Sequence, residues 1–340
     1  MAALVLAAAA SCGRTGLELD DEPHVEGTAS VVPSTSPTPD TPPGAAPPTD
    51  GVDAGPADAS VDASFDAPVD AKPDVAIDAP MDAPADAPPV KLDCTDPTIT
   101  WVYVVTDSGE LYGYDPATNV YHPRGTLSCP ANGGATPFSM AVSRTGTAFV
   151  VYNDGSLFRV STKNGSCSAT PYLSGKAGFT TFGMGFSTID QGPAETLYVA
   201  QTPETFGASG LSELGQIDTT TYALTKVANF MPSLDGSELT GTGDGRLYGF
   251  AIESNDPNAS RIVRIDKTNG KMLEQTSLAN VQIAGGWAFA FWGGDFWMFT
   301  APNDVPLLQR YSPSTGKTTK IGAPPGKVVG AGVSTCAPEQ

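Results

Sequence analysis

The sequence predicts an all-β fold built from repeated four-stranded units. A short alternating stretch that runs into a tight turn occurs five times, at residues 111–115, 157–161, 214–218, 262–266 and 308–312. Further alternating stretches surround each copy, so that each block holds four strands within about 40 to 55 residues. Strand-only repeats of this period are typical of the blades of a β-propeller.

The first strand of each block supports this interpretation independently. A small residue occupies the second position of four aligned stretches, residues 140–143, 184–187, 240–243 and 289–292. First strands of propeller blades converge on the axis of the ring, where only small side chains fit. These stretches are therefore predicted to be the inner strands.

The two ends of the folded part complement each other. Residues 331–334 form a fifth inner strand with nothing after it, whereas the domain begins near Cys94 with three strands and no inner one. We therefore predict that the C-terminal strand completes the first blade and closes a ring of five, which removes its free edges. A sixth, divergent blade in an insertion such as residues 201–213 is the alternative.

The cysteines fit a closed ring. Apart from Cys12 there are four, so three pairings are possible. Cys336 ends the closing strand and Cys94 precedes its expected neighbour, which predicts a disulfide at the seam that would contribute roughly 4 to 5 kcal/mol. Cys129 and Cys167 flank outer strands of neighbouring blades and form the second predicted pair. None of these cysteines has the spacing of a zinc site.

The first twelve residues have the character of an export signal. Residues 2–10 are apolar but too few to span a bilayer, and they fit the apolar region of a signal peptide. Ala9-Ala10-Ser11-Cys12 then resembles the lipobox of bacterial lipoproteins, which implies that Cys12 is lipidated and becomes the mature amino terminus. Because Gly13 is not Asp, the resemblance implies the outer membrane or cell surface.

Residues 13–93 are predicted to be a disordered tether. They carry seventeen acidic against three basic residues, which accounts for −14 of the net charge of −19. An Asp recurs every four residues from Asp58 to Asp86, and frequent Pro excludes a helix. Such a segment lacks the apolar content to fold and is expected to hold residues 94–340 away from the membrane. The Asp series lacks the spacing of a calcium-binding loop.

Composition also limits the partners. Residues 94–340 carry twenty acidic and fifteen basic side chains, a net charge of −5 with no basic cluster. Nucleic-acid binding needs such clusters to displace counterions, so we expect no nucleic-acid partner. We expect the domain to be monomeric.

The predicted inner strands are poor in ionisable groups. Glu238 is their one charged residue, and Asp244 follows just beyond. We predict no catalytic residue, metal or cofactor: His122 is poorly placed for a triad, and phosphate-binding and dinucleotide motifs are missing. Trp292 replaces a Ser found at the end of other inner strands, so it is a candidate stacking surface for a sugar or peptide at the channel mouth. The neighbouring Trp287, Phe289 and Phe291 are predicted to pack in the core between blades, and core packing is the alternative for Trp292.

The repeats resemble the propellers of quinoprotein dehydrogenases, regucalcin-type gluconolactonases and YncE-like surface proteins. This resemblance covers about 245 residues and rests on blade patterning, which is compatible with many activities. In the lactonases several carboxylates and amides converge on one metal, and Glu238 matches one such ligand.

Two functions follow as expectations. The first is a lipid-anchored, non-enzymatic binding module for a protein or glycan. The second is a metal-dependent lactonase or lyase with a metal near Glu238 and Asp244.

Overall fold

The computed structural model describes residues 94–340 except 95, 191, 204–211 and 254–255. Contacts divide the chain into two units, Met1–Ala79 and Pro80–Gln340, and every described residue belongs to the second. The predicted signal peptide with Cys12 and the predicted tether, residues 13–93, therefore lie outside the described residues and stay predictions. Within the described ranges, no helix has the length and apolar character needed to cross a membrane.

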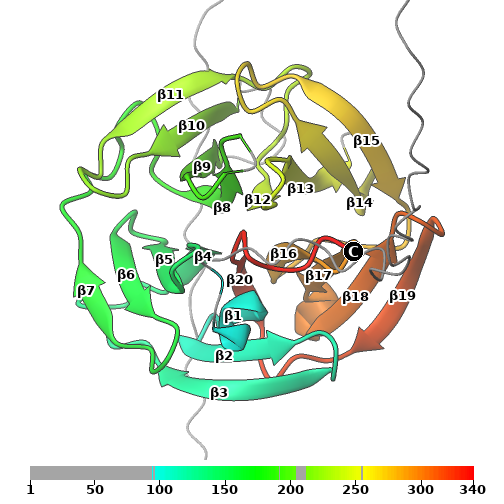
Figure 1. The fold of residues 1–340 in the computed structure, drawn as a ribbon, viewed down its shortest axis with the longest axis horizontal. Helices are drawn as coiled ribbons and strands as arrows, with labels where there is room; N and C mark the ends of the chain where they lie inside the picture. Colours follow the sequence, from blue (N-terminus) through cyan, green and yellow to red (C-terminus); the bar gives the residue numbers. More distant parts are fainter. Residues whose placement is uncertain (1–93, 95, 191, 204–211, 254–255) are drawn as a thin grey trace, which may run out of the picture. The chain divides into compact units, whose positions relative to one another are not determined.

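Five four-stranded antiparallel sheets surround a central axis, each with one strand at the axis and one at the outside (Figure 1). This confirms the predicted β-propeller, and of the two predicted forms the five-bladed one is correct.

The strands of each blade follow one another from the axis outward. In that order, blade 1 contains β20 (Val328–Val333), β1 (Val102–Thr106), β2 (Glu110–Asp115) and β3 (Val120–Thr126). Blade 2 contains β4 (Pro137–Val142), β5 (Thr147–Tyr152), β6 (Leu157–Ser161) and β7 (Cys167–Ala169). Blade 3 contains β8 (Phe182–Thr188), β9 (Glu195–Gln201), β10 (Glu213–Ile217) and β11 (Leu224–Asn229).

The remaining elements follow the same order. Blade 4 contains β12 (Glu238–Gly241), β13 (Leu247–Glu253), β14 (Asp256–Ile265) and β15 (Met272–Leu278). Blade 5 contains β16 (Trp287–Trp292), β17 (Asp295–Thr300), β18 (Leu307–Ser312) and β19 (Lys317–Gly322). Two short 3₁₀ helices are η1 (Pro97–Thr100) and η2 (Pro302–Asp304).

The C-terminal strand closes the ring as predicted. β20 pairs antiparallel with β1, with Val333 opposite Val102. Just beyond this pair, Cys94 and Cys336 form a disulfide with their Cα atoms 5.6 Å apart. Cys129 and Cys167 form the second, with Cα atoms 4.9 Å apart. Both predicted pairings are confirmed.

The repeated sequence unit ends in a side-chain-stabilised turn. In the unit that ends at Asp266, the carboxylate accepts the backbone N–H of Thr268 at 2.9 Å. Asp218 accepts that of Thr220 at 2.8 Å in the same way. An Asp at this position satisfies backbone groups that have left the sheet, which explains why the unit recurs at the hairpin between the two outer strands.

The inner strands crowd one another at the axis, as the small residues predict. A Cβ atom on Gly183 of β8 would lie 2.0 Å from the carbonyl oxygen of Ser237, beside β12. A Cβ atom on Gly332 of β20 would lie 2.7 Å from the backbone nitrogen of Val142 in β4. Backbones of neighbouring blades therefore meet directly, and little space remains along the middle of the axis.

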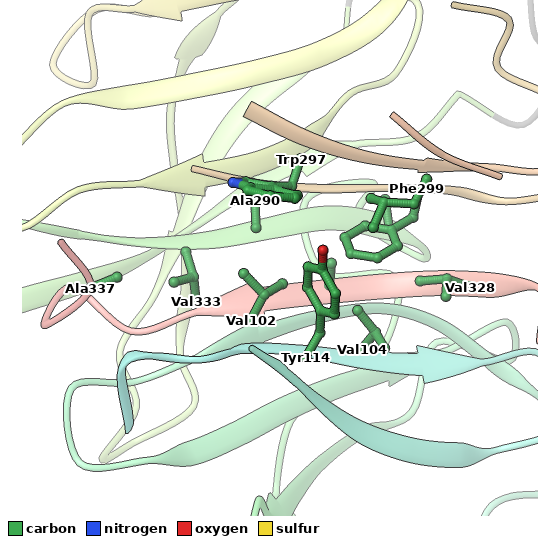
Figure 2. Packing of buried hydrophobic residues seen from close by; sticks show 12 residues of the cluster. Val102, Val104, Tyr114, Ala290, Trp297, Phe299, Val328, Val333 and Ala337 are labelled. Carbon is green, nitrogen blue, oxygen red and sulfur yellow. The ribbon is translucent and has the colours of Figure 1, made fainter. Parts of the chain in front are cut away.

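The hydrophobic core consists of five clusters, one between each pair of neighbouring blades. Figure 2 shows the cluster at the seam, where Tyr114 of β2 lies edge-on to Trp297 and Phe299 of β17. The Tyr114 hydroxyl donates a hydrogen bond to Asn119 at 2.9 Å, so its polar end is satisfied. Blades 1 and 5 thus join through packing as extensive as that of the other interfaces.

One predicted strand is shorter than expected. The alternating pattern predicts the outer strand of blade 2 at residues 166–173, but β7 ends at Ala169. The Thr170 hydroxyl donates to the carbonyl oxygen of Leu157, and Pro171 has no N–H to continue the ladder.

Candidate functional site

A cavity of about 550 Å³ opens at one end of the propeller axis. We call this the open end. Its walls come from the starts of the inner strands β4, β12, β16 and β20 and from the loops beside them. Its apolar lining consists of Pro137, Phe138, Ile252, Ile283, Ala284, Trp287 and Val329. Its polar lining includes Asp107, Thr136, Asn153, Glu238 and Lys327.

Glu238 is the buried acid of this cavity. It is the first residue of β12, and only 3 % of its surface is exposed. Its Oε2 atom accepts a hydrogen bond at 2.7 Å from the hydroxyl of Ser139 in β4, a fully buried side chain two blades away. The carboxyl group therefore reaches across the axis and links blades 4 and 2.

The close approach of blades 3 and 4 explains the position of this carboxyl. Because Gly183 has no side chain, the Ser237 carbonyl can lie against β8. The carboxyl of Glu238 then also accepts the backbone N–H of Met184 in β8. Three inner strands thus hold one acidic side chain in a single place.

Burial raises the pKa of the Glu238 carboxyl well above its ordinary range, and the hydrogen bonds from Ser139 and Met184 oppose this only in part. Within the described part of the chain, no cationic side chain is paired with Glu238. Burial in the cavity therefore disfavours the ionised form of this carboxyl group, and a positive charge that comes near would stabilise that form.

The cavity has aromatic walls and a charged rim. The indole N–H of Trp287 donates to the carbonyl oxygen of Phe250 at 3.0 Å, which fixes this ring at the start of β16. At the rim the Lys327 ammonium lies 3.1 Å from Asp107 and 3.4 Å from Asp304. The rim therefore has one cation between two carboxylates.

The opposite end of the axis is covered by the last residues of the chain. We call this the closed end, and Figure 1 shows the C-terminal segment crossing the middle of the ring. Thr335 donates to Glu195 of blade 3 at 2.9 Å, and the Gly293 N–H of blade 5 donates to the Pro338 carbonyl at 2.8 Å. Cys336 joins blade 1 through its disulfide.

The structure places the other two predicted binding residues at the closed end. Asp244 follows β12, so it and Glu238 lie at opposite ends of that strand and are not brought together. Burial would raise the pKa of Asp244, but hydrogen bonds from Arg246 and Thr242 and the Arg246 charge outweigh it, and the pKa lies below its usual value. Arg246 also lies 3.9 Å from Glu339 of the C-terminal segment.

Trp292 is the last residue of β16 and is partly buried at the seam. Its indole N–H donates to the Thr100 carbonyl at 2.8 Å, and its ring lies edge-on to Trp297. Its role as a stacking surface for a ligand stays a prediction.

The sequence singles out Glu238 but not the residues around it. Its aromatic pattern favours the core for Trp287, and nothing in it distinguishes Ser139, Phe138 or Lys327. They share one signal: each lies at or just before the start of an inner strand. Each blade contributes one inner strand, and the inner strands of all blades run in the same direction. Their starts therefore meet at one end of the axis.

Metal-binding potential is limited in the part of the chain that the structure covers. No group of three or more His, Cys, Asp or Glu side chains there could hold a metal ion. Glu238 accepts one hydrogen bond from the Ser139 hydroxyl and one from the backbone N–H of Met184.

Comparison with known proteins supplies no family. No protein-family model matches the chain. No curated protein matches it either. Among solved structures the chain is similar to one in "Crystal structure of Nidogen/Laminin Complex", with a TM-score of 0.42 and 11 % identity over 68 % of this chain and 96 % of that one. So slight a likeness carries no argument about function, which must come from the site.

Proposed function

We propose that the protein is a lipid-anchored β-propeller of the bacterial cell envelope, and that it acts by non-enzymatic binding in the axial cavity. The observation that carries the proposal is the cavity, whose volume of about 550 Å³ is within the range of small-molecule sites. Mostly apolar walls around a few convergent polar groups are the ordinary composition of such sites.

The position of the cavity supports this proposal. Cys94, where the described chain begins, is held by its disulfide to Cys336 just beyond the end of β20, whereas Asp107, after the far end of β1, lines the cavity. At about 3.3 Å per residue, the six residues of β20 separate the disulfide from the cavity by roughly 20 Å. The point at which the described chain begins is therefore at the other end of the axis from the cavity.

Anchoring is tested through Cys12. We expect the chain in the membrane fraction of the producing bacterium, with mass spectrometry detecting acyl groups on the peptide that begins with Cys12. The Cys12→Ser chain should be absent from that fraction. Equal membrane association of both chains would contradict lipid anchoring.

Binding is tested by photo-cross-linking on intact cells. A photoreactive phenylalanine analogue replaces Phe138 in the cavity, and the matched control carries it at Leu273, which is exposed on the outer strand β15. We expect ligand adducts at position 138 and not at position 273. Adducts at neither position, or equally at both, would contradict a cavity-binding function.

The enzymatic alternative is tested on the same protein. Hydrolysis of a lactone panel that is lost with a chelator and with Glu238→Gln would replace the binding proposal by a metal-dependent lactonase.

A further inference from the structure

The axial cavity contains an unusual combination of groups for a site that is mainly apolar. Glu238 is buried with no cationic partner in the described part of the chain, while Phe138 and Trp287 supply aromatic surface to the same cavity. A buried carboxylate without a counter-charge is costly, and proteins ordinarily pair it or replace it. The missing partner is a positive charge.

The geometry points to a small organic ammonium ion as the ligand of this cavity, with its charged group on Glu238 and its apolar body against Phe138 and Trp287. This inference rests on the proposed binding function and names its ligand class. The cavity has room for a ring-sized apolar body in addition to the ammonium group.

Hydrogen bonding favours this class. Ser139 and the Met184 N–H both donate to Glu238, so both stabilise its ionised form. A carboxylate has about four acceptor positions, which leaves some for an ammonium group with its three N–H donors. The aromatic rings that line the same cavity can attract the same cation, because the faces of aromatic rings carry negative charge.

The charge of the rim also favours an organic ammonium ion as the ligand. Asp107 and Asp304 flank Lys327, so this group of three carries a net charge of −1. Elsewhere on the elements packed around Glu238, Glu253 and Arg261 lie 3.9 Å from each other. Other charged side chains near these elements include Asp235, before β12, and, at the closed end, Arg144, Glu195, Asp244, Arg246 and Lys267. A negative mouth raises the local concentration of cations.

Binding of the ammonium ion should be coupled to the release of a proton from Glu238. Wherever the carboxyl is still protonated, it gives its proton to solvent as the ammonium ion arrives, so the products are a carboxylate–ammonium pair and one released proton. Affinity should therefore rise as the pH rises from 5 to 8, as long as the amine itself stays protonated.

The test uses three probes of similar shape with the full chain: 2-phenylethylamine, 2-phenylethanol and 3-phenylpropionate. Isothermal titration calorimetry measures their affinities at pH 7, and two buffers of different protonation enthalpy give the number of protons released. We expect the amine to bind at least tenfold more tightly than the alcohol, with proton release, and the anion to bind most weakly.

The variant Glu238→Gln keeps the shape of the side chain and an acceptor for Ser139 but removes the charge. We expect it to lose the tenfold preference for the amine while it still binds the alcohol. Glu274→Gln, which makes the same substitution at an exposed carboxylate of β15 paired with Arg264, is the matched control and should keep the preference.

Equal affinity for amine and alcohol in the wild-type chain, or a preference that survives Glu238→Gln, would overturn the inference. Proton release is measured on the wild-type chain alone, so the test stands even if a variant fails to fold. If no ammonium preference exists but cells still yield adducts at position 138, the ligand class is wrong and the binding function survives. If none of the probes binds and no adducts form, the binding function itself fails.

Discussion

The two ends of the propeller axis use the same five inner strands for different purposes. At the closed end, the C-terminal segment and the Cys94–Cys336 disulfide tie the blades together. At the open end, the strands diverge around a cavity that holds Glu238. The closed end gathers contacts that stabilise the ring, whereas the open end keeps an acid whose burial costs free energy.

This contrast indicates which of the two acids of blade 4 is the better candidate for ligand binding. Asp244 at the closed end has Arg246 at 2.8 Å and accepts a hydrogen bond from Thr242, so its charge is already balanced. Glu238 at the open end has no such balance within the described chain. A perturbed acid in a cavity is the better candidate for binding than an acid in a completed ion pair.

The largest effect is expected from the seam. Replacing both Cys94 and Cys336 by Ser should lower the free energy of unfolding by roughly 5 kcal/mol, because the bond closes a loop of 242 residues. Replacing Cys129 and Cys167, which close a loop of 38 residues, should cost about 1.6 kcal/mol less, since the entropy difference scales with the logarithm of the ratio of the two lengths.

Urea unfolding followed by circular dichroism measures both double variants. The amine preference of the open end should persist in both under native conditions. A larger loss from the shorter loop would show that the closed end does not carry the stability that its contacts suggest.

A smaller effect is expected from Trp292. Trp292→Ala should lower the free energy of unfolding by about 2 to 3 kcal/mol, because it removes packing against Trp297 and the hydrogen bond to Thr100. Ligand binding in the cavity should not change, since the cavity lies at the other end of β16. Val120→Ala, at a partly exposed position of β3, is the control and should stay within about 0.5 kcal/mol of wild type. Unchanged stability with weaker glycan or peptide binding would instead support the stacking role that the sequence predicts.

The smallest effect is expected from the two acids of blade 4, whose contributions to stability should change with pH in opposite directions. The pKa of Glu238 is raised on folding, so its contribution to stability is complete below about pH 4.5 and is lost as the pH rises toward its folded value. The pKa of Asp244 is lowered, so its contribution is present above about pH 3.8 and is lost as the pH falls below that.

Unfolding free energies from pH 3 to pH 8 measure this difference. Relative to wild type, Glu238→Gln should gain stability as the pH rises above 4.5, whereas Asp244→Asn should show its deficit at neutral pH and lose it in acid. Curves of the same sign for both variants would mean that the two ends are electrostatically alike.

Much of the architecture could be predicted from the sequence because it is repeated. Five copies of one unit, small residues such as Ala141 and Gly241 on the inner strands, and the lone strand at 331–334 were enough to predict the ring and its closure. The pairing of Cys94 with Cys336 followed from that closure.

The site was less predictable. Glu238 was visible as the charged residue of an inner strand, but its contact with Ser139 joins residues 99 positions apart and depends on how closely the blades approach. The separation of Glu238 from Asp244 also depends on strand direction. β12 begins with Glu238 at one end of the axis, and the turn that contains Asp244 follows it at the other end. Trp287 and Phe289 belong to one stretch in which aromatic residues alternate with Ala, yet Trp287 lines the cavity and Phe289 is buried.

The closing strand also determines when the first blade can be completed during synthesis of the chain. β1 is made early but pairs with β20, and 222 positions separate Thr106 from Val328. At translation rates of about 5 to 20 residues per second, the first blade waits roughly 10 to 45 s for its inner strand. During that interval β1 has an unpaired edge, and a chain that stops short of Val328 never covers it. The Cys94–Cys336 bond therefore forms only on chains that have been synthesised as far as Cys336, and it distinguishes these from chains that stop earlier.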